Sequence, residues 1–388
     1  MDRAVPLNLA ISVLVFCLAA GALVYLMAGY PLLLAWFPWR RRPPVRKDFT
    51  RHGAVTVLLA VYNGEAFLRA KLESILKLEY PKNLLEIIVI SDGSTDRTDE
   101  IASEFATAGV RLLRVPHGGK AAALNAGMAQ ANGEILFFTD VRQLLAPESL
   151  RHLVACLADP TVGCATGELH IQAGHSRAEA DMGLYWRYEI WARKQMSTID
   201  SLCGATGCIY AMRRELAAPL PADTVLVDIT LPLGAFFQGY RLILEPEAKA
   251  YDLPFSLESE FSRRMRTLAG MWQLLARHPR LLGSRNRMRL HFLSHKFGRL
   301  IVPYATFTAV AASFLLPDPW RAAALIAAGS ILVLALLDWL TPERWPVKRV
   351  TSPLRTLLVM QAATVCACSV LFVPPRRLWK QRDVRNTG

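Results

Sequence analysis

The sequence contains little cysteine, and its seven cysteines show no pairing pattern. Their number is odd, and none of them forms a Cys-x-x-Cys pair. These features argue against a disulfide framework and against a zinc site. We therefore expect the soluble part of the chain to work in a reducing, cytosolic setting. The cysteines are Cys17, Cys156, Cys164, Cys203, Cys208, Cys366 and Cys368.

Two common nucleotide-binding motifs are also missing. No Gly-x-Gly-x-x-Gly fingerprint follows the first predicted strand, and the sequence has no Walker A loop. Their absence argues against a dinucleotide-binding fold and a P-loop enzyme. Acidic residues are outnumbered as well, with 32 Asp and Glu against 45 Lys and Arg and a net charge of +13. This basic excess is suited to nucleic acid, anionic lipid or an anionic substrate.

Long apolar runs, by contrast, are present. The chain has 388 residues and is 53% hydrophobic, which fits one sizeable domain plus membrane segments. Residues 7–37 are apolar for about thirty residues, enough to cross a bilayer with tilt and too long for a signal peptide. A basic cluster follows, so the positive-inside rule places this end in the cytosol. The cluster consists of Arg40, Arg41, Arg42, Arg46 and Lys47.

Three further apolar runs lie near the C-terminus, at residues 299–316, 320–340 and 354–373. The first two are predicted to form a hairpin around the intervening proline-rich turn. The third precedes a basic tail, which the positive-inside rule keeps in the cytosol. Two alternatives therefore remain for residues 354–373: a membrane span, or a re-entrant or interfacial helix.

The middle of the chain alternates between short apolar runs and amphipathic segments. This alternation predicts an α/β fold with a mostly parallel, doubly wound sheet. Strands are expected at 55–61, 85–90, 110–115, 135–139, 162–171, 208–212 and 241–250, and helices at 65–78, 98–108, 118–131, 149–158 and 178–195.

A basic segment follows this domain. Between residues 261 and 299 there are ten Lys and Arg and no Asp or Glu, interleaved with large apolar residues. This composition is typical of amphipathic helices on an anionic membrane surface. A solvated basic face and an RNA-binding patch are the alternatives. We favour the membrane surface because apolar runs begin immediately afterwards.

Two acids follow predicted strands. Asp140 ends the buried run 135–139, where an acid at the carboxyl edge of a sheet can hold a cation and, through it, phosphates. Asp92 lies in a Ser-Asp-Gly-Ser-Thr-Asp turn after the second strand, where it can accept a hydrogen bond from a base or form an Asx turn. Alone, Asp140 could simply end its strand or cap the next helix.

Together and in this order, these motifs resemble the processive, membrane-bound family 2 glycosyltransferases, which include the cellulose, hyaluronan and poly-N-acetylglucosamine synthases. The resemblance covers nearly the whole chain. It implies a Rossmann-like GT-A fold in the cytosol, a nucleoside-diphosphate sugar bound with Mg²⁺ or Mn²⁺, and sugar transfer with inversion. The donor implied is a UDP-sugar, because the acid matched by Asp92 usually contacts uracil.

The resemblance also implies the donor-side residues. The first-strand loop Ala-Val-Tyr-Asn and the Gly-Lys-x-x-Ala-Leu-Asn element match family motifs, and Lys120 adds a cation to a helix start suited to anions. Asp140 matches the first acid of an Asp-x-Asp metal motif. The nucleotide-sugar-binding residues implied are Ala60, Tyr62, Asn63, Asp92, Lys120, Asn125, Asp140, Arg142 and Arg266, with Asp140 as the metal ligand.

The chain departs from the family at the metal motif, where Arg142 replaces the second acid. Substrate phosphates and waters can supply most metal ligands, so Asp140 can serve as the main protein ligand. Alternatively, Arg142 neutralises part of the phosphate charge and the metal dependence is weaker. Glu168 and His170, on a later strand, are further candidates to approach the metal.

The resemblance assigns Asp228 as the general base, since one carboxylate suffices to take the acceptor proton. The acid that precedes it in the family is Val227 here, and a helix N-cap is the alternative role. Two positions of the family's Gln-x-x-Arg-Trp element are also changed, to Arg263 and Thr267. The implied acceptor-binding residues are Gly204, Thr206, Gly207, Tyr210 and Trp272, with Trp272 a candidate substitute for the missing tryptophan.

The sequence thus predicts a multi-pass protein of the inner (plasma) membrane with a cytosolic catalytic domain. It transfers sugar to a glycan or lipid-linked acceptor in cell-surface glycan synthesis, beside membrane lipids and other polysaccharide-biosynthesis proteins, and binds no nucleic acid. A single addition to a polyprenyl phosphate and a non-catalytic scaffold are the alternatives. The predicted regions are an anchor (1–38), a linker (39–53), a GT-A domain (54–254), interfacial helices (255–298), a transmembrane region (299–375) and a basic tail (376–388).

Overall fold

The computed structural model describes residues 7–36, 41–171, 177–252, 257–342 and 345–373. The chain divides into two compact units. A helical unit comprises Met1–Phe37, Ala173–Tyr188 and Phe255–Phe372, and an α/β unit comprises Pro38–Gln172, Glu189–Pro254 and Val373–Gly388. Helix α7, Arg177–Ile199, contributes residues to both units.

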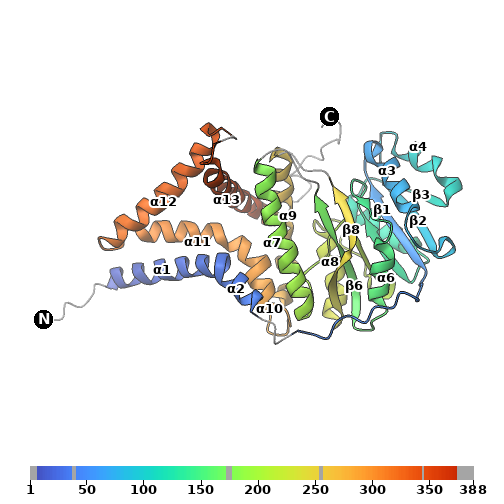
Figure 1. Ribbon diagram of the computed structural model, residues 1–388, viewed down its shortest axis with the longest axis horizontal. Helices are drawn as coiled ribbons and strands as arrows, with labels where there is room; N and C mark the ends of the chain where they lie inside the picture. Colours follow the sequence, from blue (N-terminus) through green and yellow to red (C-terminus); the bar gives the residue numbers. More distant parts are fainter. Residues whose placement is uncertain (1–6, 37–40, 172–176, 253–256, 343–344, 374–388) are drawn as a thin grey trace. The chain divides into compact units, whose positions relative to one another are not determined.

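The α/β unit contains one eight-stranded sheet with the order β3-β2-β1-β4-β7-β6-β8-β5 (Figure 1). Strands β3, β2, β1 and β4 are parallel, as the alternation predicted. β6 and β8 also pair in parallel, whereas β7 is antiparallel to both β4 and β6, and β5 is antiparallel to β8, so the sheet is mixed rather than wholly parallel. The strands are β1 Val55–Val61, β2 Leu85–Asp92, β3 Val110–Val115, β4 Ile135–Thr139, β5 Leu144–Leu145, β6 Val162–Ile171, β7 Tyr210–Arg213 and β8 Arg241–Asp252.

Burial explains why the central strands are almost entirely apolar. Helices cover the sheet, so β1 and β4 have no exposed residue and can form the core on both faces. The predicted helix at 98–108 is shorter than expected, because α4 ends at Glu104 and a 3₁₀ turn leads to the left-handed Gly109. The helices of this unit are α3 Glu65–Leu76, α4 Thr98–Glu104, α5 Lys120–Gln130, α6 Ser149–Leu157 and α8 Val227–Phe237.

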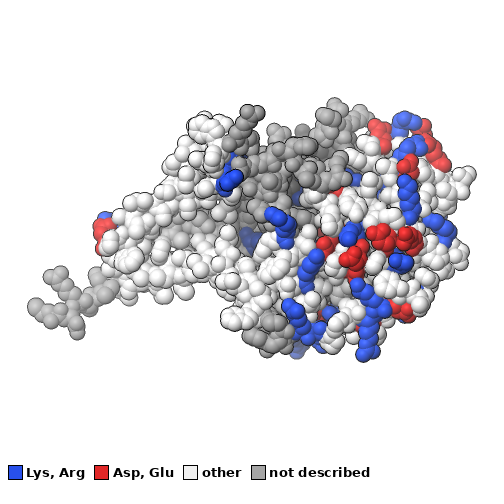
Figure 2. Space-filling view, in the orientation of Figure 1, with Lys and Arg blue, Asp and Glu red and all other residues white. Residues whose placement is uncertain are grey.

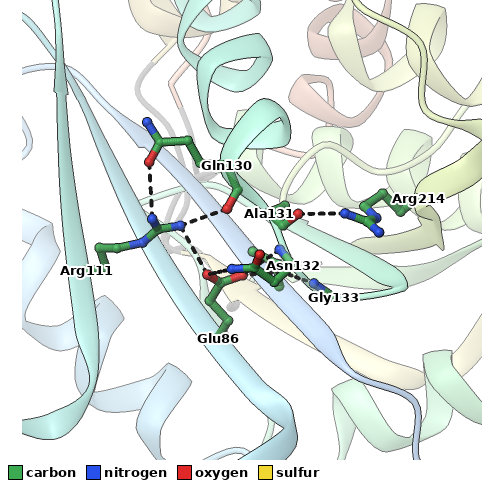
Figure 3. Close-up of polar contacts among 8 residues, drawn as sticks. Glu86, Arg111, Gln130, Ala131, Asn132, Gly133 and Arg214 are labelled. Atoms are coloured by element: carbon green, nitrogen blue, oxygen red, sulfur yellow. Dashed lines mark hydrogen bonds and ion pairs between the residues drawn. The ribbon is translucent and has the colours of Figure 1, made fainter.

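A polar network fixes the end of α5 against the sheet (Figure 3). The Glu86 carboxylate accepts hydrogen bonds from Thr56 at 2.6 Å, from the Asn132 side chain at 2.8 Å and from Arg111 at 3.1 Å. Arg111 also donates to the Gln130 carbonyl at 2.9 Å, one of the carbonyls that the helix end leaves without a partner. The network therefore joins β1, β2 and β3 to the turn between α5 and β4.

The helical unit pairs α1 (Leu7–Val24) with α11 (Gly298–Ser313). Where the two meet, a Cβ on Gly298 would lie 2.5 Å from a methyl of Leu26, so glycine permits the close approach. The Tyr25 hydroxyl also contacts the Ser294 hydroxyl at 2.7 Å. Since the start of α11 lies beside the end of the first helix, the two helices run antiparallel.

Three helical segments of this unit are long and apolar enough to cross a membrane: Leu7–Ala35, Trp320–Leu340 and Lys348–Leu371. Helix α11, in the predicted run 299–316, has 16 residues and continues from a π-helical turn. The described surface of α1, α11 and α12 (Trp320–Leu337) is almost uniformly uncharged (Figure 2). The remaining long helices of the unit are α9 Leu257–Arg277 and α13 Lys348–Ala367.

The Figure 3 network yields a stability prediction. Glu86→Gln should lower the free energy of unfolding by roughly 1–3 kcal/mol, because it weakens hydrogen bonds to a charged acceptor. Burial raises the pKa of Glu86, but hydrogen bonds from Asn132 and Thr56 outweigh it and lower that pKa below its usual value. The stabilisation should therefore be present near neutral pH and fade as the pH falls through this pKa. Denaturant unfolding of purified protein at several pH values measures it.

Glu104→Gln is the matched control, because the Arg69–Glu104 ion pair is exposed on both sides. Such pairs contribute about 0–1 kcal/mol. Equal losses for the two variants would contradict the structural role of Glu86.

Candidate active site

The candidate site lies where three parallel strands end. β1 pairs in parallel with β2 on one side and with β4 on the other, so their carboxyl ends share one edge of the sheet. The residues that follow or end these strands are Tyr62, Asn63, Asp92 and Asp140, all predicted from the sequence. In open α/β sheets, ligands bind at this edge.

Asp92, at the end of β2, shapes the loop that precedes α5. Its buried carboxylate accepts hydrogen bonds from the backbone N–H groups of Gly118, at 2.7 Å, and Gly119, at 2.9 Å. His117 contacts the Asp92 carbonyl through Nδ1 at 2.8 Å, and its ring lies 4.4 Å from that of Tyr62. Asp92 thus brings two rings and the start of α5 together, an arrangement suited to a planar base.

Asn63 ties the end of β1 to the loop after β2. It has a left-handed backbone with φ of 48°, a conformation that Asn tolerates better than most residues. Its side-chain oxygen accepts from the Thr95 N–H at 2.8 Å, and its own N–H donates to Ser94 at 3.2 Å. Asn63 therefore fixes the shape of the predicted nucleotide loop, which also contains Ala60 and Tyr62.

Lys120 and Asp140 meet across the site. Lys120 is the first residue of α5, and its Nζ lies 2.5 Å from Asp140 Oδ1 just beyond β4. Both side chains remain partly exposed, at 42% and 36%. A cation and a carboxylate that reach solvent at one helix start form a suitable place for a diphosphate and its counter-ion.

Arg142 is held by a residue that the sequence analysis missed. Its Nε lies 2.8 Å from Oδ1 of Asp252, the last residue of β8, and the Asp252 side chain is 1% exposed. Gln143 donates to the other Asp252 oxygen at 2.6 Å. The arginine that replaces the second metal acid is thus paired with an acid from a distant strand. The Arg142–Asp252 pairing follows from the register of β8 with its neighbouring strands, which the sequence does not show.

Lys71 is a second residue that the sequence analysis missed. It lies on α3 among apolar residues and is completely buried. Its Nζ donates to Thr139 Oγ1 at 2.6 Å and to the Gln143 carbonyl at 2.5 Å, so it clamps both ends of the loop that carries Asp140 and Arg142. Burial lowers the pKa of Lys71 to about 7, against the opposing effects of Cys208 and Asp140.

Asp228 lies beside the predicted acceptor loop. Pro232, inside α8, has no N–H for the Asp228 carbonyl four residues earlier, and that carbonyl instead accepts from Ala205 at 2.8 Å. A Cβ on Gly207 would lie 3.3 Å from an Asp228 carboxylate oxygen. The helix N-cap is Leu226, so Asp228 belongs to the first turn and the capping alternative is wrong.

The acceptor loop is fixed on its other side by β6. The Thr206 N–H donates to Thr166 at 2.8 Å, and the Thr206 hydroxyl donates to the Gly167 carbonyl at 3.0 Å. Gly204 needs to be glycine, because a Cβ there would lie 2.7 Å from Ile229 of α8. The loop is therefore held at a set distance from the first turn of α8.

Arg193 of α7 adds a buried cation near this loop. Burial lowers its pKa, and the negative charges of Glu189 and Asp228 partly offset that effect. Its guanidinium also approaches the Gly204 carbonyl at 3.4 Å. No sequence pattern pointed to Arg193, which lies within an aromatic-rich helix.

Two predicted binding residues have structural partners instead. The Asn125 side chain forms two hydrogen bonds with the backbone of Leu220, at 2.7 Å and 2.9 Å. The Tyr210 ring is buried and stacks on Phe138 with centroids 4.6 Å apart. These placements argue against substrate contacts by either side chain.

Four further residues predicted from the sequence remain, namely Glu168, His170, Arg266 and Trp272. Glu168 pairs with Lys194 at 2.8 Å and lies 3.7 Å from His170. Arg266 and Trp272 lie on α9 in the helical unit, where Arg266 is exposed, so their part in the site stays a prediction.

The residues present fit a metal held mainly by substrate. In the described part of the chain, no three His, Cys, Asp or Glu side chains gather as a metal site. Asp140 offers one partly exposed carboxylate. Mg²⁺ is commonly bound by one or two carboxylates together with phosphates and waters. Asp140 therefore suits a cation that arrives with a diphosphate.

Comparisons with known proteins agree with this geometry. Residues 56–219 match the family described as glycosyl transferase family 2. "Probable glycosyltransferase YdaM" of Bacillus subtilis (strain 168) is 32% identical over 231 residues, 55% of this chain and 54% of that protein. The chain thus spans about half the length of that relative. The poly-beta-1,6-N-acetyl-D-glucosamine synthase of Staphylococcus epidermidis is 23% identical, over 75% of this chain and 74% of its own length.

A solved structure covers more of the chain. The mannosyltransferase PcManGT from Pyrobaculum calidifontis, in complex with GDP-Man and Mn²⁺, is 25% identical, with a TM-score of 0.73. The match covers 94% of this chain and 99% of that one. The predicted GT-A-like fold with long apolar helices at both ends is confirmed, and its sheet is mixed.

Lys71 yields a prediction for pH-dependent stability. The pKa of Lys71 is lower in the folded state than in the unfolded chain, so the unfolded state binds more protons between about pH 7 and 10. Stability should therefore rise with pH in this range, by up to about 1.4 kcal/mol per pH unit. Lys71→Met should remove this slope. It should also weaken nucleoside-diphosphate binding severalfold, because the loop at 139–143 loses its clamp.

Lys77→Met is the matched control at the C-cap of the same helix, because Lys77 is exposed. Denaturant unfolding from pH 6 to 10 and titration with UDP and GDP give both readouts. Identical behaviour of the two variants would rule out the clamp.

Proposed function

We propose that this chain, which belongs to glycosyl transferase family 2 through residues 56–219, transfers a sugar from a nucleoside diphosphate to an acceptor hydroxyl with inversion. The observation that carries the proposal is the meeting of Asp92, Lys120 and Asp140 at the ends of parallel strands. The acceptor class is a glycan or a lipid-linked sugar carrier at the cytosolic face of the plasma membrane.

The donor side follows from the charges at the strand ends. Lys120 binds the diphosphate at the start of α5. Asp140 would hold a Mg²⁺ or Mn²⁺ ion, which would supply positive charge against the leaving diphosphate. Asp252 orients the Arg142 guanidinium, and Arg142 keeps the net charge of the loop at 139–143 close to zero.

The acceptor side follows from Asp228 and its loop. Asp228 takes the proton from the acceptor hydroxyl as that oxygen attacks the anomeric carbon of the sugar. Gly204, Thr206 and Gly207 hold the loop beside Asp228, because they contact β6 and α8. The acceptor hydroxyl reaches the Asp228 carboxylate past this loop. The loop thus positions the acceptor while the base stays fixed by the first turn of α8.

The Asp92 carboxylate selects the nucleobase of the donor by hydrogen bonding. A carboxylate accepts the ring N–H of uracil or guanine, whereas adenine has no equivalent donor. UDP and GDP donors both fit, and the relative crystallised with GDP-Man supports keeping the second beside the UDP-sugar expected from the sequence. Displacement of a fluorescent nucleotide should therefore rank UDP or GDP at least tenfold tighter than ADP. Equal binding of all three would contradict this role for Asp92.

Asp228→Asn separates catalysis from structure. Asparagine keeps the shape and hydrogen bonding of the side chain but cannot take a proton, so transfer should fall by about 10²–10⁴-fold. Nucleotide affinity should barely change, because other residues hold the diphosphate. Sugar transfer and nucleotide binding are measured in the same membranes, with exposed Asp223→Asn as the control. Near-normal transfer would leave Asp228 without a chemical role.

Asp140→Asn tests the metal assignment. The variant should lose turnover and should bind Mn²⁺ at least tenfold more weakly in the presence of UDP or GDP, as followed by the Mn²⁺ electron paramagnetic resonance signal. EDTA should inhibit the wild-type protein. Full activity in EDTA would shift the neutralising role to Arg142, and no turnover with any nucleotide sugar would favour a non-catalytic scaffold.

A further inference from the structure

Three apolar segments are long enough to cross a membrane, but one differs from the others. The segment Lys348–Leu371, which contains α13, has a mean hydropathy of 1.7, against 2.6 for Leu7–Ala35 and 2.2 for Trp320–Leu340. Length and composition alone permit it to span. Whether it does depends on what it packs against.

Helix α13 packs along the basic helix α9. Arg264 of α9 lies with its guanidinium 2.8 Å from the sulfur of Met360. Met360 is close to the midpoint of the 24-residue segment, so a spanning α13 would place this arginine near the centre of the bilayer. Charged side chains at that depth are strongly disfavoured, whereas arginines in the headgroup layer are common.

The first turns of α13 are bound to the end of α12 by a buried acid. The Asp338 carboxylate is 1% exposed and lies 3.2 Å from Lys348 Nζ and 2.8 Å from Arg355. Thr351 donates to the same carboxylate at 2.8 Å. Arg355 is about 10 Å along the helix from Lys348, at the usual rise per residue. The polar first third of α13 therefore lies at the same membrane depth as the end of α12.

Helices α1, α11 and α12 have other main neighbours, since α1 packs on α11, and α12 packs on both α11 and α13. α11 runs antiparallel to α1, and α12 follows after a short turn that carries the exposed ion pair Arg321–Asp318. Their described surfaces are almost free of charge in the view of Figure 2. In Figure 1, α1 and α11 run side by side, and α12 slants away from them toward α13, which also packs against α9. Helices α1 and α12 lie in segments long and apolar enough to cross, and the 16-residue α11 is the apolar helix that joins them.

We propose that α13 does not cross the membrane but lies with α9 in the cytosolic headgroup layer, where arginines of α9 face anionic lipid. The chain then crosses through α1, α11 and α12, and its C-terminus stays in the cytosol. All basic clusters that flank these segments, including the tail after residue 374, are then on the cytosolic side, as the positive-inside rule requires.

Depth measurements with spin labels test this arrangement independently of enzymatic activity. Val359 and Ile331 are exposed apolar residues near the midpoints of Lys348–Leu371 and Trp320–Leu340, at 42% and 45% exposure. Val359→Cys and Ile331→Cys are made in full-length protein whose seven native cysteines are replaced, labelled, and reconstituted in vesicles with anionic phospholipid. Collision with oxygen and with a water-soluble nickel complex reports depth.

The label at position 331 should lie near the bilayer centre, with little collision with the nickel complex. The label at position 359 should collide with that complex severalfold more often. Equal, deep positions for both labels would overturn the proposal.

The side on which the chain ends gives a second test. A cysteine appended after residue 388 should resist an impermeant maleimide in intact cells and react in inverted vesicles. A cysteine at Asp318, in the α11–α12 turn, should show the opposite pattern. Labelling of the C-terminal cysteine from outside would overturn the proposal even if the label at 359 were shallow.

Discussion

The structure depends on the parallel pairing of β1 with β2 and β4. Because the three strands point the same way, the residues that end them share one edge. The network around Glu86 anchors the turn between α5 and β4, so the far ends of that helix and strand can carry Lys120 and Asp140 into contact. The positions of Lys120 and Asp140 at one edge of the sheet therefore depend on the Glu86 hydrogen bonds at the opposite edge.

Buried polar groups give the site loops their shape. Both carboxylate oxygens of Asp92 accept hydrogen bonds from backbone N–H groups. Lys71 donates to both ends of the loop at 139–143. Such groups cost free energy to bury, and they remain favourable only when their hydrogen bonds are satisfied. Asp252 plays the same part for Arg142. The departure from the usual pair of metal acids is thus accompanied by a compensating acid from β8.

The helical unit contains two apolar segments of similar length with different packing neighbours. Segments Trp320–Leu340 and Lys348–Leu371 both pass a length and hydropathy criterion. They differ in their neighbours, since α13 packs on the arginine-bearing α9 and is tied by Asp338 to the end of α12.

The sequence alone determined the alternating core, the long apolar segments and the acids at strand ends, because burial on both faces leaves continuous apolar runs and turn residues mark where they stop. It also placed Asp228 and the loop at Gly204–Gly207 in order. It could not find Lys71, Arg193 or Asp252, since each looks like an ordinary charged residue in its own segment. Nor could it show that Asn125 and Tyr210 serve the fold. Only tertiary structure decided these roles, because the partners lie far away in the chain and burial depends on how distant strands and helices pack.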